Sequence, residues 1–239
     1  MTKFTSKWLY IFITLLIYLQ GCDSRPKNID PIKGFESVAS KLEDAINYEI
    51  QSKDLNAISM VLVDDQKIAW SKGFGYEDPE RKIFADAYTI YRVGSVSKLF
   101  TDMAIMQRVE KGEIDLDKPI QNYLPDFNPS NPYKKPITLR QMMSHRSGLL
   151  REPREGNYFT DDEISLKATV ESIIPSKLIH EPESKTKYSN AAIAVVGYTL
   201  ESLYEISYVE YMQKNILEKI GMHNSAFAPN RKISSRLAK

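Results

Sequence analysis

Ser95 and Lys98 have the residue types and the spacing needed for acyl transfer. Residues i and i+3 share one face of a helix, so the Lys98 ammonium can sit beside the Ser95 hydroxyl. A serine hydroxyl is a weak nucleophile at neutral pH and needs a neighbouring base to take its proton. The start of a helix also offers free N–H groups and a positive dipole end, which favour developing negative charge. The pair therefore predicts a nucleophilic serine.

The Ser-x-x-Lys spacing is not specific, because the chain contains it three times. Ser24 and Lys27 lie in a polar N-terminal segment, and Ser184 and Lys187 lie in a polar turn. Only Ser95 begins a long amphipathic pattern, so its context selects it. Taken alone, the spacing is equally typical of a helix-capping serine followed by a surface lysine.

Tyr188 and Asn190 form the second candidate group, in the only Tyr-x-Asn of the chain. They stand at the start of an apolar helical pattern, which can hold both side chains rigidly. Tyrosine has an ordinary pKa of about 10 and acts as a base only where cations stabilise its phenolate; Lys98 is the candidate cation. The Asn190 amide can donate to a substrate carbonyl and accept from Lys98. In isolation, the motif is also typical of a packing tyrosine and a helix-start asparagine.

Composition excludes several classes of protein. Lys and Arg number 32 against 31 Asp and Glu, so the formal net charge is +1. The chain therefore lacks the excess of positive charge that is typical of nucleic-acid-binding proteins. The single cysteine, Cys22, excludes a disulfide within the chain and a cysteine-built zinc site. The three histidines lie far apart without a His-Glu-x-x-His pair. We therefore expect no metal centre.

The first 21 residues predict a secretory signal. Two lysines precede an apolar run, residues 8–19, whose length as a helix is about 18 Å, against about 30 Å for a hydrocarbon core. Residues 19–22 resemble a bacterial lipoprotein cleavage box, which implies cleavage before Cys22 and acylation of Cys22. Residues 22–34 would then tether the protein to a membrane at the extracytoplasmic side of the cell envelope. The alternatives are an uncleaved anchor or a chance Gly-Cys pair.

The rest of the chain predicts a mixed α/β fold with one β-hairpin. Residues 58–63 and 67–73 read as its two strands, and residues 76–88 read as a loop. Apolar spacing predicts helices over 35–51, 95–112, 139–148, 170–179, 191–203 and 208–220. A lone hairpin is marginal in water. Either helices alone cover it, or further strands of its sheet lie beyond Lys239.

The segment Tyr91–Thr101 closely resembles the nucleophile segment of the serine β-lactamase and penicillin-binding superfamily. Tyr188-Ser189-Asn190 resembles the second motif in its class C β-lactamase, esterase and DD-peptidase form. Other segments similar to that family, in the expected order, are Gly73–Tyr76, Ile137–Leu149 and Leu217–Met222. The resemblance runs from about Phe35 to Phe227. It implies a hydrolase domain over 35–239, an antiparallel sheet flanked by helices with a helical subdomain near 113–186.

The resemblance also implies roles for individual residues. Ser95 would form an acyl-enzyme, with Lys98 assisting its deprotonation and Tyr188 acting as general base and acid. How Tyr188 and Lys98 divide the proton transfer stays open. Asn190 would orient the substrate and Lys98, and His145 would have a structural role. The substrate would be a β-lactam, a cell-wall peptide or a small ester, and the resemblance implies no metal or organic cofactor.

The chain departs from the family in one respect. No Lys-Thr-Gly or His-x-Gly follows Tyr188, although the family carries that third motif on a strand beside the cleft. This absence agrees with the shortage of strands, and both indicate the front part of a longer protein, without its C-terminal strands. The alternatives are a non-catalytic lipoprotein that binds cell-wall peptides or a partner, and an inactive truncated product.

Overall fold

The computed structural model describes residues 28–157 and 164–239. The predicted signal segment 1–21 and the lipidation site Cys22 lie outside the described residues. The predicted tether is described from Asn28 onward. There, the main chain of Ile29 exchanges hydrogen bonds with Ser71 at 2.9 and 3.0 Å, so this part of the segment lies along a sheet edge. No helix in the described ranges is long and apolar enough to cross a membrane.

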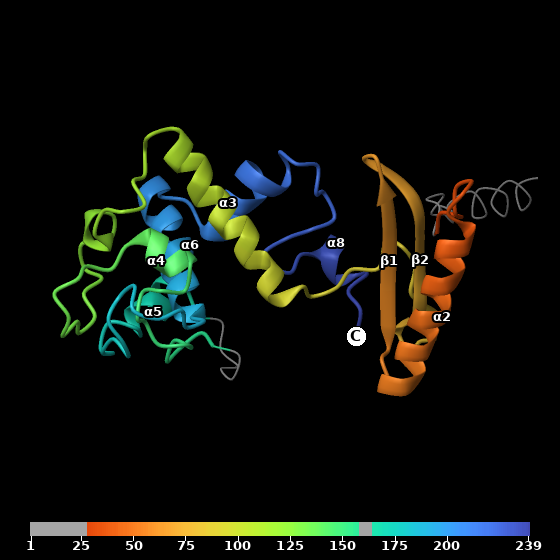
Figure 1. Ribbon diagram of the computed structural model, residues 1–239, viewed down its shortest axis with the longest axis horizontal. Coiled ribbons are helices and arrows are strands. Elements are labelled where there is room, and N and C mark those ends of the chain that lie inside the picture. Colours follow the sequence, from red (N-terminus) through yellow and green to blue (C-terminus); the bar gives the residue numbers. More distant parts are fainter. Residues whose placement is uncertain (1–27, 158–163) are drawn as a thin grey trace, which may run out of the picture. The chain divides into compact units, whose positions relative to one another are not determined.

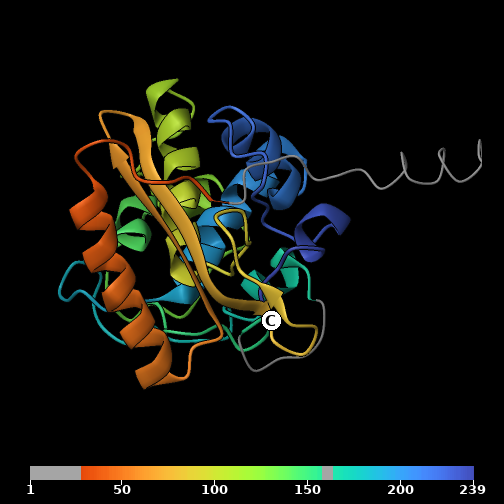
Figure 2. The same cartoon turned by 90° about the vertical axis from the view of Figure 1, so that its right-hand side faces the viewer.

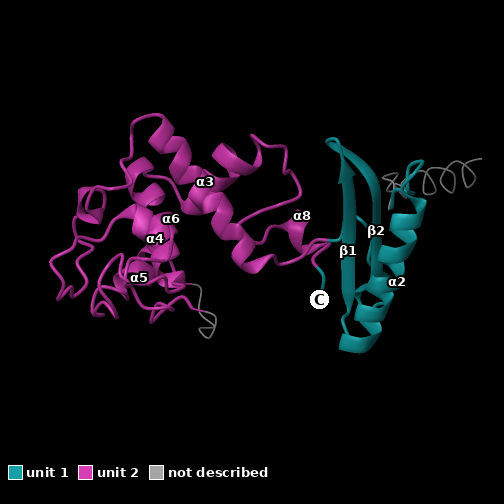
Figure 3. Ribbon diagram, in the orientation of Figure 1, with its two compact units in different colours: residues 1–89, 238–239 teal, residues 90–237 magenta. Residues whose placement is uncertain are grey.

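The chain divides into two compact units, residues 1–89 with 238–239, and residues 90–237 (Figure 3). Unit 1 contains helix α2 (Glu36–Lys53) and strands β1 (Ala57–Asp64), β2 (Lys67–Asp78) and β3 (Ile83–Phe84) (Figure 1). The strands form an antiparallel sheet in the order β1-β2-β3. The mixed α/β architecture and the hairpin are as predicted.

Helix α2 packs along the β1–β2 hairpin (Figure 2). The small core between them consists of Ala39, Ile46, Trp70 and Phe74, all buried. The hairpin turn is made by Asp65 and Gln66, both with positive φ, which gives the tight two-residue connection that a twisted hairpin requires. The sheet is therefore covered on one face by a single amphipathic helix.

The prediction of a loop over residues 76–88 was wrong in part, because β2 continues to Asp78 and β3 pairs with it, whereas residues 79–82 and 85–88 do form turns and irregular chain. Gly73 and Gly75 suggested a strand end. Instead, a Cβ at Gly73 would lie 2.4 Å from the carbonyl oxygen of Ala85, so glycine stands there because another main chain passes close by. Strand β3 was missed because it is only two residues long.

Unit 2 is helical and built around the buried helix α6 (Asn190–Tyr204). Its elements in chain order are η1 (Gly94–Val96), α3 (Ser97–Glu110), η2 (Ile120–Asn122), α4 (Leu139–Met143), α5 (Leu166–Glu171), α6, α7 (Tyr208–Met212), the π-helical turn η3 (Gln213–Leu217) and α8 (Arg231–Ser234). Helix α6 contacts α3, α4, α5 and α7, because residues on all sides of it are apolar. This places the N-terminus of α6 beside the segments that carry the predicted chemistry.

Three helix predictions in unit 2 were wrong in extent. The helix expected over 170–179 is observed earlier in the chain, as α5. The Ser165 side chain accepts from the Ala168 N–H and fixes this earlier start. The helix expected over 208–220 is α-helical only to Met212 and continues as the π-helical turn. The short helix α8 was not predicted. The helix expected over 139–148 ends at Met143.

Candidate active site

Ser95 lies in the turn η1, immediately before α3, and Lys98 lies in the first turn of α3. The Lys98 ammonium donates a hydrogen bond to Ser95 Oγ at 2.9 Å. The predicted i, i+3 pairing is therefore present. The helix begins two residues later than predicted, so Ser95 stands ahead of α3, in a tighter 3₁₀ turn.

Tyr188 reaches the same hydroxyl from a distant part of the chain. Its phenol donates to Ser95 Oγ at 2.7 Å across 93 residues of sequence. The next residue, Ser189, fixes this position because its side chain accepts from the Ala192 N–H as the N-cap of α6 and donates to the Leu150 carbonyl at 2.6 Å. Ser95, Lys98 and Tyr188 thus meet at one oxygen atom.

Charged and aromatic groups surround the Tyr188 ring. The Lys98 nitrogen lies 5.1 Å from the ring centroid and the Arg151 guanidinium lies 5.6 Å from it. Burial by itself would raise the pKa of Tyr188. Hydrogen bonds with Lys98 and Ser95, together with the charges of Lys98 and Arg151, outweigh burial and bring the pKa of Tyr188 below its ordinary value. The surroundings therefore make the phenolate, which is the basic form, easier to reach than in a free tyrosine.

His145 packs on the same ring, with centroids 4.4 Å apart. Its Nδ1 accepts the Ser189 N–H at 3.3 Å, and its carbonyl accepts the Lys187 N–H at 2.7 Å. Burial, followed by the charge of Lys98, lowers the pKa of His145 and keeps the ring neutral near pH 7. These contacts hold the segment that carries Tyr188.

Asn190 differs from its expected arrangement. Its Nδ2 lies 2.8 and 2.9 Å from the two carboxylate oxygens of Glu152 and donates to that carboxylate, a partner that the sequence did not predict. Its Oδ1 is buried, and no donor from the described residues reaches it. Sequence reasoning missed Glu152, because no local pattern connects it with Asn190, 38 residues further along the chain.

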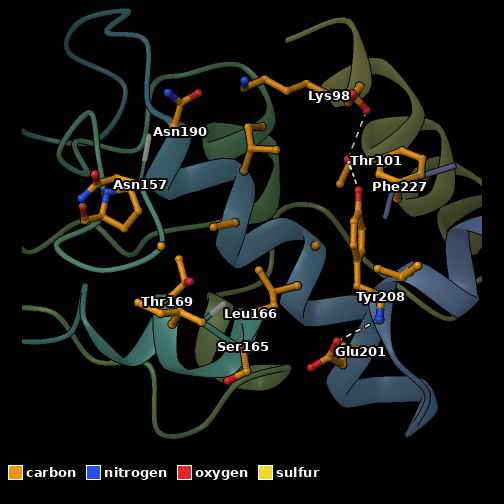
Figure 4. A pocket seen from close by; sticks show the side chains of 18 of the residues that line it. Lys98, Thr101, Asn157, Ser165, Leu166, Thr169, Asn190, Glu201, Tyr208 and Phe227 are labelled. Atoms are coloured by element: carbon orange, nitrogen blue, oxygen red, sulfur yellow. Dashed lines mark hydrogen bonds between the residues drawn. The ribbon is translucent and has the colours of Figure 1, made fainter. Parts of the chain in front are cut away.

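A pocket of about 1080 Å³ opens beside these residues, within unit 2 (Figure 4). Lys98, Asn190 and Glu152 line one part of it. Tyr208 lines another, where its hydroxyl shares a 2.7 Å hydrogen bond with Thr101. Much of the remaining wall is apolar, formed by Ile164, Leu166, Ile193, Ala194, Val209 and Phe227. Ser95 and Tyr188 are not among the lining residues, so Lys98 is the member of the group around Ser95 that borders the pocket. The pocket is large enough for a small organic molecule.

Comparison with known proteins defines the class. The model of the Beta-lactamase family matches residues 42–239, so the chain belongs to that family, within the serine β-lactamase and penicillin-binding superfamily. "Beta-lactamase-like protein 2" of Dictyostelium discoideum is 31% identical over 92% of this chain and 42% of its own length.

Solved structures share the fold. EstCE1, described as a hydrolase with promiscuous acyltransferase activity, is 25% identical with a TM-score of 0.76, covering 85% of this chain and 56% of that one. The octameric penicillin-binding protein homologue from Pyrococcus abyssi is 26% identical with a TM-score of 0.72, covering 84% of this chain and 47% of that one. The chain thus spans about half of these structures, and it spans 38% of Staphylococcus aureus Protein flp, a curated relative to which it is 25% identical.

Proposed function

We propose that this protein is a serine hydrolase that works through an acyl-enzyme at Ser95. The observation that carries the proposal is the convergence of Lys98 and Tyr188 on Ser95 Oγ, at 2.9 and 2.7 Å. A nucleophile within hydrogen-bond reach of a base, with the base itself positioned by other groups, is the arrangement that activates a hydroxyl. The other hydrolases of this fold support the same chemistry.

The proposed reaction has two steps. Ser95 Oγ attacks the carbonyl carbon of the substrate while its proton passes to Tyr188 in the phenolate form, or to Lys98 in the neutral amine form. The Ser95 N–H supplies one donor to the resulting oxyanion, and collapse of the intermediate expels the alcohol or amine, which takes up the proton. Water then attacks the acyl-enzyme with the same proton carrier acting as base, and this restores the Ser95 hydroxyl.

The proposed substrate is an ester, a β-lactam or a cell-wall peptide. The mainly apolar pocket beside Lys98 suits a compound with an apolar acyl group. We further propose that Cys22 carries a lipid and that the protein acts on the extracytoplasmic side of the cell envelope, which rests on the signal-like pattern of residues 1–22.

The test is covalent labelling with a fluorescent fluorophosphonate and a fluorescent penicillin, followed by mapping of the modified peptide. We expect the label on Ser95 and its loss in Ser95→Ala. Ser184→Ala is the matched control, because Ser184 is exposed and has the same Ser-x-x-Lys spacing. Labelling that persists in Ser95→Ala would exclude Ser95 as nucleophile. A folded protein that neither probe labels and that hydrolyses no ester would indicate a binding protein instead.

A further inference from the structure

The position of Asn190 is set by the main chain of residues 150–152. The Asn190 N–H donates to the Arg151 carbonyl at 2.7 Å, and the Ser189 hydroxyl donates to the Leu150 carbonyl at 2.6 Å. These bonds hold the start of α6 against the segment that carries Glu152. The side chains of Asn190 and Glu152 therefore meet in a fixed geometry at the pocket wall.

The carboxylate of Glu152 determines the orientation of the Asn190 carboxamide. An ionised carboxylate only accepts hydrogen bonds, whereas a carboxamide has a donor end and an acceptor end. The NH₂ group of Asn190 must therefore face Glu152, as the bonds of 2.8 and 2.9 Å show. Arg151 Nε also donates to Glu152 Oε1, at 3.3 Å.

The opposite end of the carboxamide then faces the catalytic pair. Figure 4 shows Asn190 with its oxygen turned toward the amine end of Lys98 and its nitrogen turned away. This oxygen is buried, and no hydrogen-bond donor among the described residues reaches it. A buried acceptor without a partner is costly, so it favours any donor that comes within reach. The cation labelled in this view is the Lys98 ammonium.

We propose that Glu152 is a positioning residue: it fixes the Asn190 carboxamide so that Oδ1 remains an acceptor for Lys98. Asn190 then acts on the proton carrier Lys98. This inference rests on the proposed function, because Lys98 carries a proton only if Ser95 is acylated.

Three variants test the orientation. Glu152→Gln introduces a group that can either donate or accept, so the Asn190 carboxamide is no longer held in one orientation. Asn190→Asp places two carboxylates against each other. In the double variant Glu152→Gln/Asn190→Asp, the introduced amide donates to the introduced carboxylate. The second oxygen of the introduced carboxylate again faces Lys98, and the total charge of the two side chains is the same as in the parent protein. Glu155→Gln is the control, since Glu155 is an exposed carboxylate nearby.

We expect Glu152→Gln to lower the rate constant of Ser95 acylation by a fluorogenic ester by about 10-fold and Asn190→Asp to lower it by about 100-fold, as for hydrogen bonds to charged groups. The double variant should recover to within about 10-fold of the parent, a clear departure from additivity. Glu155→Gln should change the rate by less than about 2-fold. A double variant as slow as the product of the two single effects would overturn the proposal. Thermal melting checks that each variant is folded.

A second readout does not need activity. In ¹⁵N-labelled protein, the two side-chain N–H signals of Asn190 are identified by their loss in Asn190→Asp. We expect Glu152→Gln to shift them and Glu155→Gln to leave them in place. Unmoved signals in Glu152→Gln would refute the positioning contact. Absence of any acylation in the parent, together with shifted signals, would refute the proposed function and keep the contact.

Discussion

The amine of Lys98 lies 5.1 Å from the ring centroid of Tyr188 while it donates to the hydroxyl of Ser95. The phenol of Tyr188 donates to that same hydroxyl. Each of the three side chains therefore contacts or faces the other two, and loss of one changes the surroundings of both others. A group of this kind is strongly non-additive when it acts as a catalytic unit.

Removal of either proton carrier should slow acylation of Ser95. We expect Lys98→Met and Tyr188→Phe each to lower the second-order rate constant of fluorophosphonate labelling by about 100- to 10,000-fold, the usual range for a lost general acid–base group. The double variant should be little slower than the slower single variant. Lys187→Met is the matched control, from the exposed Ser184-x-x-Lys187 pair. Equal labelling of Tyr188→Phe and the parent would show that Tyr188 takes no part.

The pH dependence of acylation should follow Tyr188. Its pKa lies below its ordinary value, so the rate should rise with pH through a midpoint below about 10 as the phenolate forms. Arg151→Ala removes one of the charges that stabilise the phenolate, so we expect the midpoint to move to higher pH. Arg154→Ala, an exposed arginine nearby, should leave it unchanged. The measurement is a pH–rate profile of labelling for each variant. An unchanged midpoint in Arg151→Ala would contradict the stabilisation of the Tyr188 phenolate by Arg151.

Asp102 in α3 should make the protein less stable as the pH rises. Burial raises the pKa of Asp102 to about 6, and no donor from the described residues reaches its Oδ1. Because the pKa is higher in the folded state than in the unfolded state, the folded state binds the proton more tightly. The free energy of unfolding therefore falls between about pH 4 and pH 6 and stays lower above pH 6.

We expect Asp102→Asn to raise the melting temperature at pH 7.5 by about 2–4 °C, equivalent to about 1 kcal/mol after allowance for the partial exposure of Asp102. The gain should shrink toward zero at pH 4, where the native carboxyl is already protonated. Asp126→Asn changes an exposed carboxylate and serves as the control. An equal gain at both pH values would indicate a cause other than ionisation. Thermal unfolding at pH 4 and pH 7.5 supplies the measurement.

Gly148 should tolerate no side chain. Its φ is +82°, and a Cβ there would lie 2.2 Å from the carbonyl oxygen of His180. We expect Gly148→Ala to lower the free energy of unfolding by about 2–4 kcal/mol, as the clash and the strained backbone add together. Gly112→Ala is the matched control, because Gly112 has φ +73° with open space around it, so only about 1 kcal/mol of backbone strain applies. Urea unfolding gives both values, and equal losses would show that contact with His180 is unimportant.

Local patterns in the sequence were sufficient for much of this protein. The Ser95–Lys98 pairing follows from the spacing of one helical turn, and α2, the β1–β2 hairpin and α6 follow from their apolar periodicity. These features involve residues that are neighbours along the chain, so propensity and spacing are enough to predict them. Tyr188 was selected by a motif and a resemblance, and the fold then brought it to Ser95.

Other features depend on contacts between distant residues, and no local pattern contains them. Strand β3 exists because β2 extends past Gly73 and pairs with it, and Glu152 meets Asn190 because the main chain of residues 150–151 binds the start of α6. The orientation of the Asn190 carboxamide is likewise a consequence of a carboxylate 38 residues away. A hydrogen bond depends on the separation and direction of two groups in space, and for groups far apart along the chain these quantities exist only once the molecule has folded.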